Sequence, residues 1–310
     1  MTKKVIYIMS DNRSGSTLLD QLLGANPSIM SLGEVHHLAA YALQDRSIYD
    51  PVHPLVCSCG YAVPNCTFWS GVEDRLGQPL SSLRMKLRLF DRRRHKYAAK
   101  RFTKRTVRNV LDRYPKLLST ILFRAILSSK QLARDSFDLF DAAFDASGVR
   151  YLVDSSKSTN RMRTLYDHKP ERLIVIMLAR NYKGTVHSKM KRGVSMEQAI
   201  ESWTRQIVAM KKVVDDIPKK QVIRVKYEDL CANPAEELNR ICGMLDVDFS
   251  EEMLSRPSDG VHHLGGSPSK FDPNQTDIAF DDSYLTAFSV EQLEFMKTVV
   301  GDAARDWGYD

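Results

Sequence analysis

The sequence predicts an α/β fold: a parallel β-sheet with helices on both faces and a helical insertion. Four short apolar runs predict the strands, at residues 5–9 (VIYIM), 151–153 (YLV), 173–178 (LIVIML) and 222–225 (VIRV). The runs are mostly continuous and do not alternate, which is typical of strands covered by helices on both faces. Polar or small residues and then a helical pattern follow each run, and this βα order is that of a parallel sheet.

Apolar periodicity predicts helices at residues 17–25, 161–167, 183–190, 196–216, 234–245 and 290–304. Asn26-Pro27 ends the first of them, and Ser289 is a suitable N-cap for the last. Residues 80–145 contain no strand pattern and predict several helices, interrupted at Pro115. Since no repeat or low-complexity linker divides the chain, we expect one domain over residues 1–310, with the helical insertion at about 80–145.

The composition is that of an ordinary globular enzyme, with 43% hydrophobic and 27% charged residues among 310. No run approaches the 18 apolar residues of a membrane-spanning helix. The basic start of the chain leads directly into Asp11, Asn12 and Arg13 with no small-residue cleavage site. This favours a buried strand over a signal peptide and predicts a cytoplasmic protein.

The positive charge is concentrated in one segment. From Arg84 to Lys116 there are 14 Lys and Arg against two acids, a local net charge of +12, so the rest of the chain carries −5 of the total of +7. Apolar residues recur within the segment and predict basic amphipathic helices. Three interpretations stay open: a solvated helix face, a groove for an anionic acceptor such as an acidic glycan, or peripheral contact with anionic membrane lipid. Charge this localised argues against a nucleic-acid partner.

The segment from Ser10 to Thr17 (SDNRSGST) follows the first predicted strand and opens the first predicted helix. Such a junction directs backbone N–H groups and the positive helix end toward one point, which suits a phosphate. Compared with the P-loop pattern G-x4-G-K-[ST], Gly15 matches but Ser16 replaces the lysine that reaches the β- and γ-phosphates. Arg13 supplies a fork-shaped cation instead. An ATP- and Mg²⁺-dependent kinase is therefore an alternative that Ser16 disfavours.

A second anion site is predicted after the strand at 173–178. Arg180 stands at the carboxyl end of that strand, and Ser188 falls one to two turns inside the next helix. Arg192 follows Ser188 by one turn, on the same helix face. Two cations and a hydroxyl can thus converge on a second anionic group, the alternative being a solvated start of a helix.

Together these two segments resemble the 5′-phosphosulfate loop and the 3′-phosphate segment of sulfotransferases that use 3′-phosphoadenosine 5′-phosphosulfate (PAPS). Residues 222–230 (VIRVKYEDL) with Asn233-Pro234, and residues 263–270 (HLGGSPSK), resemble two further segments of that family in the same order. The resemblance implies a P-loop NTPase-like sulfotransferase fold with PAPS as donor. It also implies the cofactor-binding residues, which are Arg13, Ser14, Gly15, Ser16, Thr17, Arg180, Ser188, Arg192, Tyr227, Ser267 and Lys270.

Arg13 before Ser-Gly-Ser is closer to the carbohydrate and tyrosyl-protein branches of the family than to the cytosolic phenol and steroid branch, which carries Lys there. We therefore expect sulfuryl transfer to a hydroxyl of a carbohydrate or glycoconjugate. A small phenol or alcohol as acceptor is the alternative within the family. A non-catalytic protein that binds polyanions or membranes through its basic helices is the alternative outside it.

Sulfuryl transfer needs a base for the acceptor hydroxyl and cations for the leaving phosphate. Arg13 and Lys157, the latter just past the strand at 151–153, are the candidate cations. Lys157 corresponds by resemblance to a leaving-group lysine of the tyrosyl-protein branch. Glu34 matches a glutamate that serves as base in that branch, and His36 or His37 is the alternative base. No metal is expected in this chemistry.

The sequence contains five cysteines, an odd number that predicts mostly reduced thiols. Cys57, Cys59 and Cys66, with His53 nearby, offer four zinc ligands, although C-x-C is tighter than the usual C-x2-C spacing. A Cys59–Cys66 disulfide and buried free thiols are the other two interpretations.

Overall fold

A computed structural model describes residues 3–49, 54–86, 115–256, 261–267 and 278–309, with residues 115–125 described by their backbone alone. Its sheet has five strands in the order β2-β3-β1-β4-β5. All four neighbouring pairs are parallel. The strands are β1 (Lys4–Ser10), β2 (Ile29–Gly33), β3 (Tyr151–Lys157), β4 (Leu173–Ala179) and β5 (Val222–Lys226). The predicted α/β class with a parallel sheet is confirmed.

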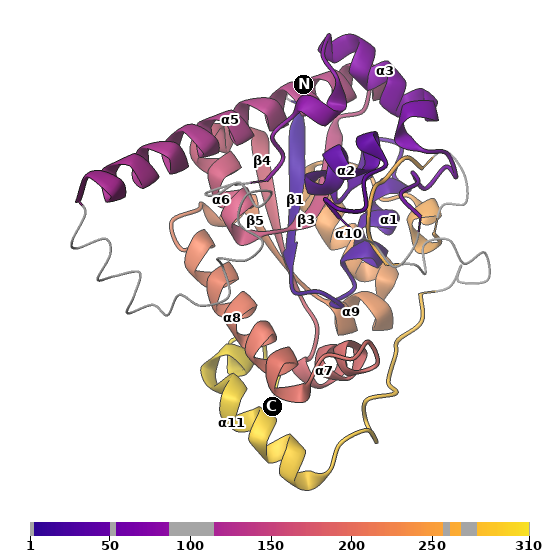
Figure 1. Ribbon diagram of the computed structural model, residues 1–310. Coiled ribbons are helices and arrows are strands. Elements are labelled where there is room, and N and C mark those ends of the chain that lie inside the picture. Colours follow the sequence, from indigo (N-terminus) through magenta and orange to yellow (C-terminus); the bar gives the residue numbers. More distant parts are fainter. Residues whose placement is uncertain (1–2, 50–53, 87–114, 257–260, 268–277, 310) are drawn as a thin grey trace.

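Helices cover both faces of this sheet (Figure 1). One face carries α1 (Ser16–Gly24), α9 (Tyr227–Ala232) and α10 (Pro234–Leu245). The other carries α2 (Leu38–Leu43), α3 (Thr67–Leu76), α5 (Pro115–Ser147), α6 (Thr159–His168), α7 (Tyr182–Met190), α8 (Met196–Val214) and α11 (Val290–Arg305). Short 3₁₀ turns lie at Val35–His37, Val63–Asn65, Leu80–Ser82, Pro170–Arg172, Lys219–Gln221 and Glu251–Leu254.

The central strand β1 shows how one sequence serves both layers. Tyr7 and Met9 pack into one core, and Ile6 and Ile8 pack into the other. Successive side chains of a strand point to opposite faces, so a strand between two helical layers must be apolar at every position. All four of these side chains are fully buried. The apolar run that predicted the strand is therefore continuous because both faces of β1 are buried.

The four strands and six helices predicted from periodicity are confirmed, with ends that coincide or differ by at most four residues. Ser289 caps α11 as predicted, within a capping box that includes Gln292. The edge strand β2 was not predicted, because Ser31 and Gly33 interrupt its apolar pattern. Both residues lie where β2 must pack closely: the Cβ of Ser31 is 2.9 Å from a Cβ placed on Gly24 of α1.

In the region predicted as a helical insertion, the described residues from 115 onward are helical, and the insertion as a whole remains a prediction. The described part of this region is one long helix, α5, from Pro115 to Ser147. The predicted interruption at Pro115 depends on the preceding residues, which lie outside those described. Figure 1 shows that the N-terminal end of α5 projects beyond the sheet. Residues 87–114, which hold most of the basic segment, lie outside the described residues. Among the helices that are described, none is long and apolar enough to cross a membrane.

Candidate active site

The loop between β1 and α1 has the backbone of an anion-binding turn. Gly15 has a φ of +87° and Arg13 a φ of +71°, so the chain passes through left-handed conformations before α1 begins. The Tyr227 ring packs on Gly15 so closely that a Cβ there would lie 2.3 Å from the ring. The Ser14 hydroxyl is buried and has no hydrogen-bond partner, although buried hydroxyls are normally paired. The loop therefore has an unsatisfied donor available for a ligand oxygen.

The Arg13 guanidinium joins three segments that are distant in the sequence. Its Nε donates to Ser188 Oγ of α7 at 3.1 Å, and its Nη1 donates to Ser267 Oγ at 3.2 Å. Burial and the positive charges of Arg192 and Arg180 lower the pKa of Arg13 from its usual value. Three arginine charges thus converge beside the loop, an arrangement that a doubly anionic ligand would stabilise.

Arg180 lies at the carboxyl end of β4, as predicted, and is buried. Its Nη2 donates to the Asp281 backbone carbonyl at 3.0 Å and to Asp281 Oδ2 at 3.1 Å. Its guanidinium stacks on the Tyr227 ring, 4.6 Å from the ring centroid. The buried Nε has no hydrogen-bond partner. Arg180 is therefore positioned rigidly by Tyr227 and Asp281, with one donor still unused. The sequence interpretation missed Asp281, which follows no strand and belongs to no motif.

Glu34 and Lys157, predicted separately as base and cation, form a direct ion pair between the end of β2 and the end of β3. Both side chains are largely buried, with exposed fractions of 11% for Glu34 and 15% for Lys157. Glu34 Oε1 also accepts a hydrogen bond from the Gly266 N–H at 3.0 Å. The carboxylate and the ammonium group are thus held together at the carboxyl edge of the sheet, where ligands of such sheets bind.

A backbone irregularity directs Lys157 into the site. The pairing of β1 with β3 shifts register between Tyr7 and Met9, and Lys157 itself has a φ of +66°. Bulges and positive φ angles in non-glycine residues cluster near functional sites because surrounding contacts must hold them in place. Gln206 of α8 supplies such contacts, since its amide donates to the carbonyls of Ser10 at 3.1 Å and Lys157 at 3.2 Å.

The two histidines that were candidate bases have environments that favour the neutral imidazole. Burial lowers the pKa of His36 well below its usual range. Burial, with the nearby charge of Lys86, lowers the pKa of His37 to about 2. Because the Lys86 ammonium can only donate, His37 Nδ1 accepts its hydrogen bond at 2.9 Å, and Nε2 lies 3.7 Å from Glu34 Oε2. That separation is too long for a hydrogen bond. Because a lowered pKa makes both imidazoles weaker proton acceptors, Glu34 stays the predicted base.

The late loop, residues 261–267, contacts the end of β2 and the loop between β1 and α1. Leu264 pairs with the end of β2, since its N–H donates to Leu32 O at 3.0 Å and its carbonyl accepts from the Glu34 N–H at 2.7 Å. The Ser267 N–H donates to Thr17 Oγ1 at 3.0 Å. A Cβ on Gly265, whose φ is +68°, would lie 2.8 Å from Glu34 Cβ. Lys270 lies outside the described residues.

The structure thus brings together Arg13, Ser14, Gly15, Thr17, Glu34, Lys157, Arg180, Ser188, Tyr227 and Ser267. Arg192 is exposed and acts on Arg13 through its charge. Ser16 is buried as the first residue of α1. Which of these side chains contact a donor nucleotide remains a prediction.

Two buried ion pairs support the site and were not predicted. Lys189 of α7 pairs with Asp11 of the phosphate loop, and both are more than nine-tenths buried. Arg161 of α6 donates to Asp154 of β3 through Nε at 3.2 Å and Nη2 at 3.1 Å. Sequence patterns could not pair these residues, because each pair joins two different segments. The pairs form only when α6 and α7 pack on the sheet.

The first cations of the basic segment have local partners. The Arg84 N–H donates to Asp135 Oδ2 at 2.6 Å, and its Nη1 donates to Ser128 Oγ at 3.1 Å, both on α5. Lys86 binds His37 next to the candidate base. The structure thus ties Arg84 to α5 and Lys86 to His37, while the Arg84 side chain remains exposed.

The family model described as "Sulfotransferase family" matches residues 77–251 of this sequence, more than half of its 310 residues. The chain therefore belongs to the sulfotransferase family. The PAPS-dependent enzyme class predicted from the motifs is confirmed at the level of the family. The matched range covers neither the loop between β1 and α1 nor the late loop, so the roles of those two segments stay predictions.

Curated relatives are similar over part of the chain. A protein-tyrosine sulfotransferase of Drosophila melanogaster is 26% identical over 139 residues, which is 42% of this chain and 27% of that protein. A putative protein-tyrosine sulfotransferase of Caenorhabditis elegans is 27% identical over 136 residues, 40% of this chain and 52% of that protein. The chain thus matches about half of each relative's length or less.

Solved structures share the fold over the whole chain. The sulfotransferase domain from the curacin biosynthetic pathway superposes with a TM-score of 0.58 at 17% identity, covering 100% of this chain and 99% of that domain. The sulfotransferase domain of the Synechococcus PCC 7002 olefin synthase gives 0.54 at 19% identity, covering 100% and 97%. The predicted sulfotransferase fold is confirmed.

Proposed function

We propose that this protein transfers the sulfuryl group of PAPS to an acceptor hydroxyl, with Glu34 as general base. The observation that carries the proposal is the Glu34–Lys157 ion pair at the carboxyl edge of the sheet, beside the Arg13 loop. A proton acceptor and a cation side by side are what an in-line transfer from a phosphosulfate requires.

In this mechanism the acceptor oxygen attacks sulfur while its proton passes to the Glu34 carboxylate. The bond between sulfur and the bridging phosphate oxygen breaks, and 3′-phosphoadenosine 5′-phosphate (PAP) leaves with the electron pair of that bond. Lys157, Arg13 and the N–H groups at the start of α1 stabilise the negative charge that develops on the leaving phosphate. Because Lys157 contacts Glu34 in this structure, binding of the two substrates separates the pair, so that Lys157 turns to the leaving phosphate oxygen and Glu34 to the acceptor hydroxyl.

The donor's second anion, its 3′-phosphate, is assigned to Arg180 and Ser188. The unsatisfied Nε of Arg180 and the Ser188 hydroxyl both belong to the arginine cluster around Arg13. Tyr227 and Phe280, whose ring centroids are 6.1 Å apart, lie next to Arg180 and offer apolar surface for the adenine base. Two separated anion sites distinguish PAPS from ATP, which concentrates its phosphates in one chain.

For the acceptor we propose the phenolic hydroxyl of a tyrosine in an acidic peptide, because the curated relatives are named as protein-tyrosine sulfotransferases. A hydroxyl of an acidic carbohydrate, the acceptor favoured by the sequence, is the second candidate, and the net charge of +12 between Arg84 and Lys116 suits either polyanion. A cytoplasmic location, with peripheral membrane contact through the same segment, is proposed on the sequence alone.

Titration calorimetry with PAP and with ATP tests the donor site. We expect PAP to bind with micromolar or tighter affinity in the absence of Mg²⁺, and ATP to bind far more weakly. Equal affinity for ATP, or binding that requires Mg²⁺, would refute the sulfotransferase assignment and favour a nucleotide kinase.

Radiolabelled PAPS tests the acceptor. Turnover should be measured on tyrosine peptides with acidic flanks, on the same peptides with phenylalanine in place of tyrosine, on acidic glycans and on small phenols. Label on the tyrosine peptide alone supports the proposed acceptor. Label on the glycans alone would replace it with the carbohydrate acceptor and leave the mechanism unchanged.

A further inference from the structure

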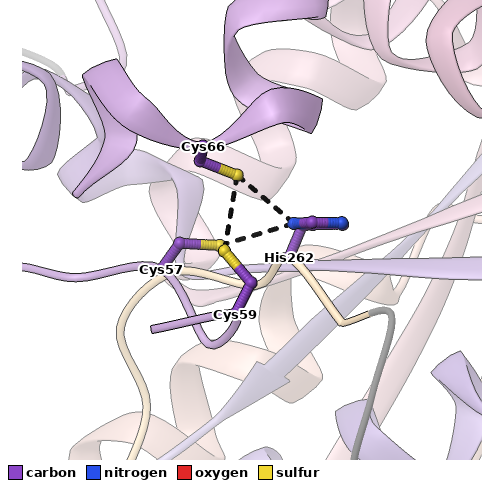
Figure 2. Close-up of side chains that lie close together, drawn as sticks. All are labelled: Cys57, Cys59, Cys66 and His262. Carbon is purple, nitrogen blue, oxygen red and sulfur yellow. Dashed lines mark hydrogen bonds between the residues drawn. The ribbon is translucent and has the colours of Figure 1, made fainter. Parts of the chain in front are cut away.

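The structure brings three cysteines and one histidine into a single cluster away from the catalytic residues. Figure 2 shows Cys57, Cys59, Cys66 and His262 converging from three loops, and their ligand atoms all lie within 4.8 Å of one another. Cys57 and Cys66 are buried, and Cys59 and His262 are half-buried. His262 was not among the candidate ligands in the sequence, because it lies far from the cysteines along the chain. His53, the fourth ligand expected there, lies outside the described residues.

Three of the six separations among these ligand atoms are close to those around a tetrahedral zinc ion, and all six are within 4.8 Å. With Zn–S bonds of about 2.3 Å and Zn–N bonds of about 2.0 Å, tetrahedral geometry requires about 3.8 Å between sulfurs and about 3.6 Å between sulfur and nitrogen. Cys59 Sγ lies 3.6 Å from Cys66 Sγ. His262 Nδ1 lies 3.3 Å from Cys66 Sγ and 3.8 Å from Cys57 Sγ. A Cys59–Cys66 disulfide is not formed, since all five cysteines are free thiols and a disulfide bond is about 2.0 Å long.

The backbone around the cluster is built to hold these positions. Between Cys57 and Cys59 the chain turns tightly, with the Gly60 N–H donating to Cys57 O at 2.9 Å and a φ of +89° at Gly60. Cys66 is the N-cap residue of α3 and its thiol is fixed by the start of that helix. This short-range order explains how a C-x-C spacing, tighter than usual, can present both sulfurs to one point.

Contacts of its ring and of its backbone also hold His262 in place. Its ring stacks on Phe68, with centroids 5.2 Å apart and planes inclined by 19°. Its carbonyl accepts a hydrogen bond from Trp69 Nε1 at 2.9 Å. The Ser58 hydroxyl donates to Val261 O at 2.8 Å and accepts from the His263 N–H at 2.9 Å. The ring is therefore oriented with Nδ1 toward the thiols by contacts that do not involve the thiols themselves.

We propose that Cys57, Cys59, Cys66 and His262 bind one structural zinc ion that fastens the late loop to the body of the domain. Four protein ligands leave no open position, which is typical of structural and not of catalytic zinc. Binding displaces the thiol protons, so the three sulfurs coordinate as thiolates and the imidazole as the neutral form. The ion takes no part in sulfuryl transfer.

The consequence for the active site follows from the chain after His262. Two residues further on, Leu264 pairs with β2, and the Gly266 N–H then donates to the candidate base Glu34. Ser267 contacts both Thr17 and Arg13 of the phosphate loop. Zinc at the cluster therefore fixes one end of the loop whose other end positions the catalytic carboxylate and the anion site.

Elemental analysis of the full-length protein, purified under reducing conditions with zinc supplied and then dialysed, tests the site. We expect one zinc per chain. His262→Ala and Cys59→Ser should lose the metal, whereas His53→Ala and Cys242→Ala should keep one equivalent. X-ray absorption should show three sulfur ligands and one nitrogen ligand. Zinc retained by His262→Ala but lost by His53→Ala would refute the proposed ligand set.

Thiol labelling of the wild-type protein keeps the test decisive if the variants fail to fold. The cluster cysteines should resist N-ethylmaleimide until a chelator is added, while labelling of Cys231 should not change. Hydrogen exchange at residues 261–267 should rise on chelation, and this readout does not depend on which donor or acceptor the enzyme uses. Reduced protein that binds no zinc when supplied with it, or a Cys59–Cys66 disulfide found by peptide mapping, would overturn the proposal.

Discussion

Replacing Glu34 with glutamine tests the catalytic assignment most directly, because the change removes a proton acceptor and little else. The glutamine side chain would retain an oxygen in the position of Oε1, so it could still accept the hydrogen bond from the Gly266 N–H and one from Lys157. The late loop should therefore stay in place. An amide cannot take a proton at neutral pH, and loss of a general base typically lowers the rate by about 10² to 10⁴. We expect kcat to fall by that factor, with PAP affinity nearly unchanged.

The same substitution also removes the counter-charge of Lys157, so stability must be measured alongside activity. Because both side chains are largely buried, we expect the free energy of unfolding to fall by about 1–3 kcal/mol. Asp11→Asn is the matched control, since it breaks an equally buried ion pair, with Lys189, whose carboxylate has no role as base. The control should lose similar stability while its kcat stays much closer to that of the wild type.

Stopped assays of PAP formation from PAPS, with calorimetry of PAP binding and thermal melts of each variant, separate the outcomes. If Glu34→Gln keeps full activity and His36→Ala abolishes it, the base is the histidine. If Glu34→Gln lowers the melting temperature and leaves kcat unchanged, Glu34 is a structural partner of Lys157 and the mechanism is wrong.

Further predictions concern the donor site, the late loop, the first helix and the basic segment. Arg180→Ala should weaken PAP binding by about 30-fold, or about 2 kcal/mol, through the lost contact with the 3′-phosphate, while adenosine 5′-phosphosulfate, which lacks that phosphate, binds as before; an equal loss for both ligands would show a structural role. Gly265→Ala should reduce kcat because a Cβ there would displace the candidate base, whereas Gly148→Ala, with a φ of +72° and no atom within 4 Å, should affect stability alone; equal activities would contradict the contact. Burial raises the pKa of Asp20 to about 7, above the value of about 3.9 in unfolded chains. The preference of the folded state for the protonated carboxyl therefore stabilises the protein fully below about pH 3.9, and this stabilisation is lost as the pH rises through about 7. Asp20→Asn, which imitates the protonated form, should therefore gain stability relative to the wild type between pH 5 and pH 8 in thermal melts, and a constant difference would refute this. Neutralising Arg92–Arg94 should impair use of anionic acceptors or association with anionic vesicles at low salt and leave PAP affinity unchanged; unaffected acceptor kinetics and vesicle binding would indicate a solvated surface.

The sequence predicted the parts of the fold that are set by local pattern. Strands buried on both faces must be apolar throughout, so β1 and β4 were visible as continuous runs. The edge strand β2 was not, because a position packed against Gly24 accepts only a small residue and Ser31 removed the apolar signal. Helix caps also depend on local sequence, and Ser289 was predicted as the N-cap of α11 from its residue type and its place before the helical pattern.

The candidate site was predictable where residues follow strand ends, and unpredictable where it depends on tertiary contact. Arg13, Lys157 and Arg180 each follow a strand of one parallel sheet, so their convergence could be expected. Asp281 and His262 carry no such signal, because neither follows a strand and each is placed by contacts with residues far away in the sequence. That Glu34 and Lys157 touch each other could not be read from two motifs separated by more than a hundred residues.

The hydrogen bonds between the late loop and the first phosphate loop have a consequence for the timing of biosynthesis. Residues 13, 17 and 34 leave the ribosome before the partners that complete their contacts, Ser267 and Gly266, which emerge only after the entire sheet has been synthesised. A nascent chain can therefore form the strands and bury most of its core while its anion site is still open. Activity should appear only after residue 267 has been released from the ribosome.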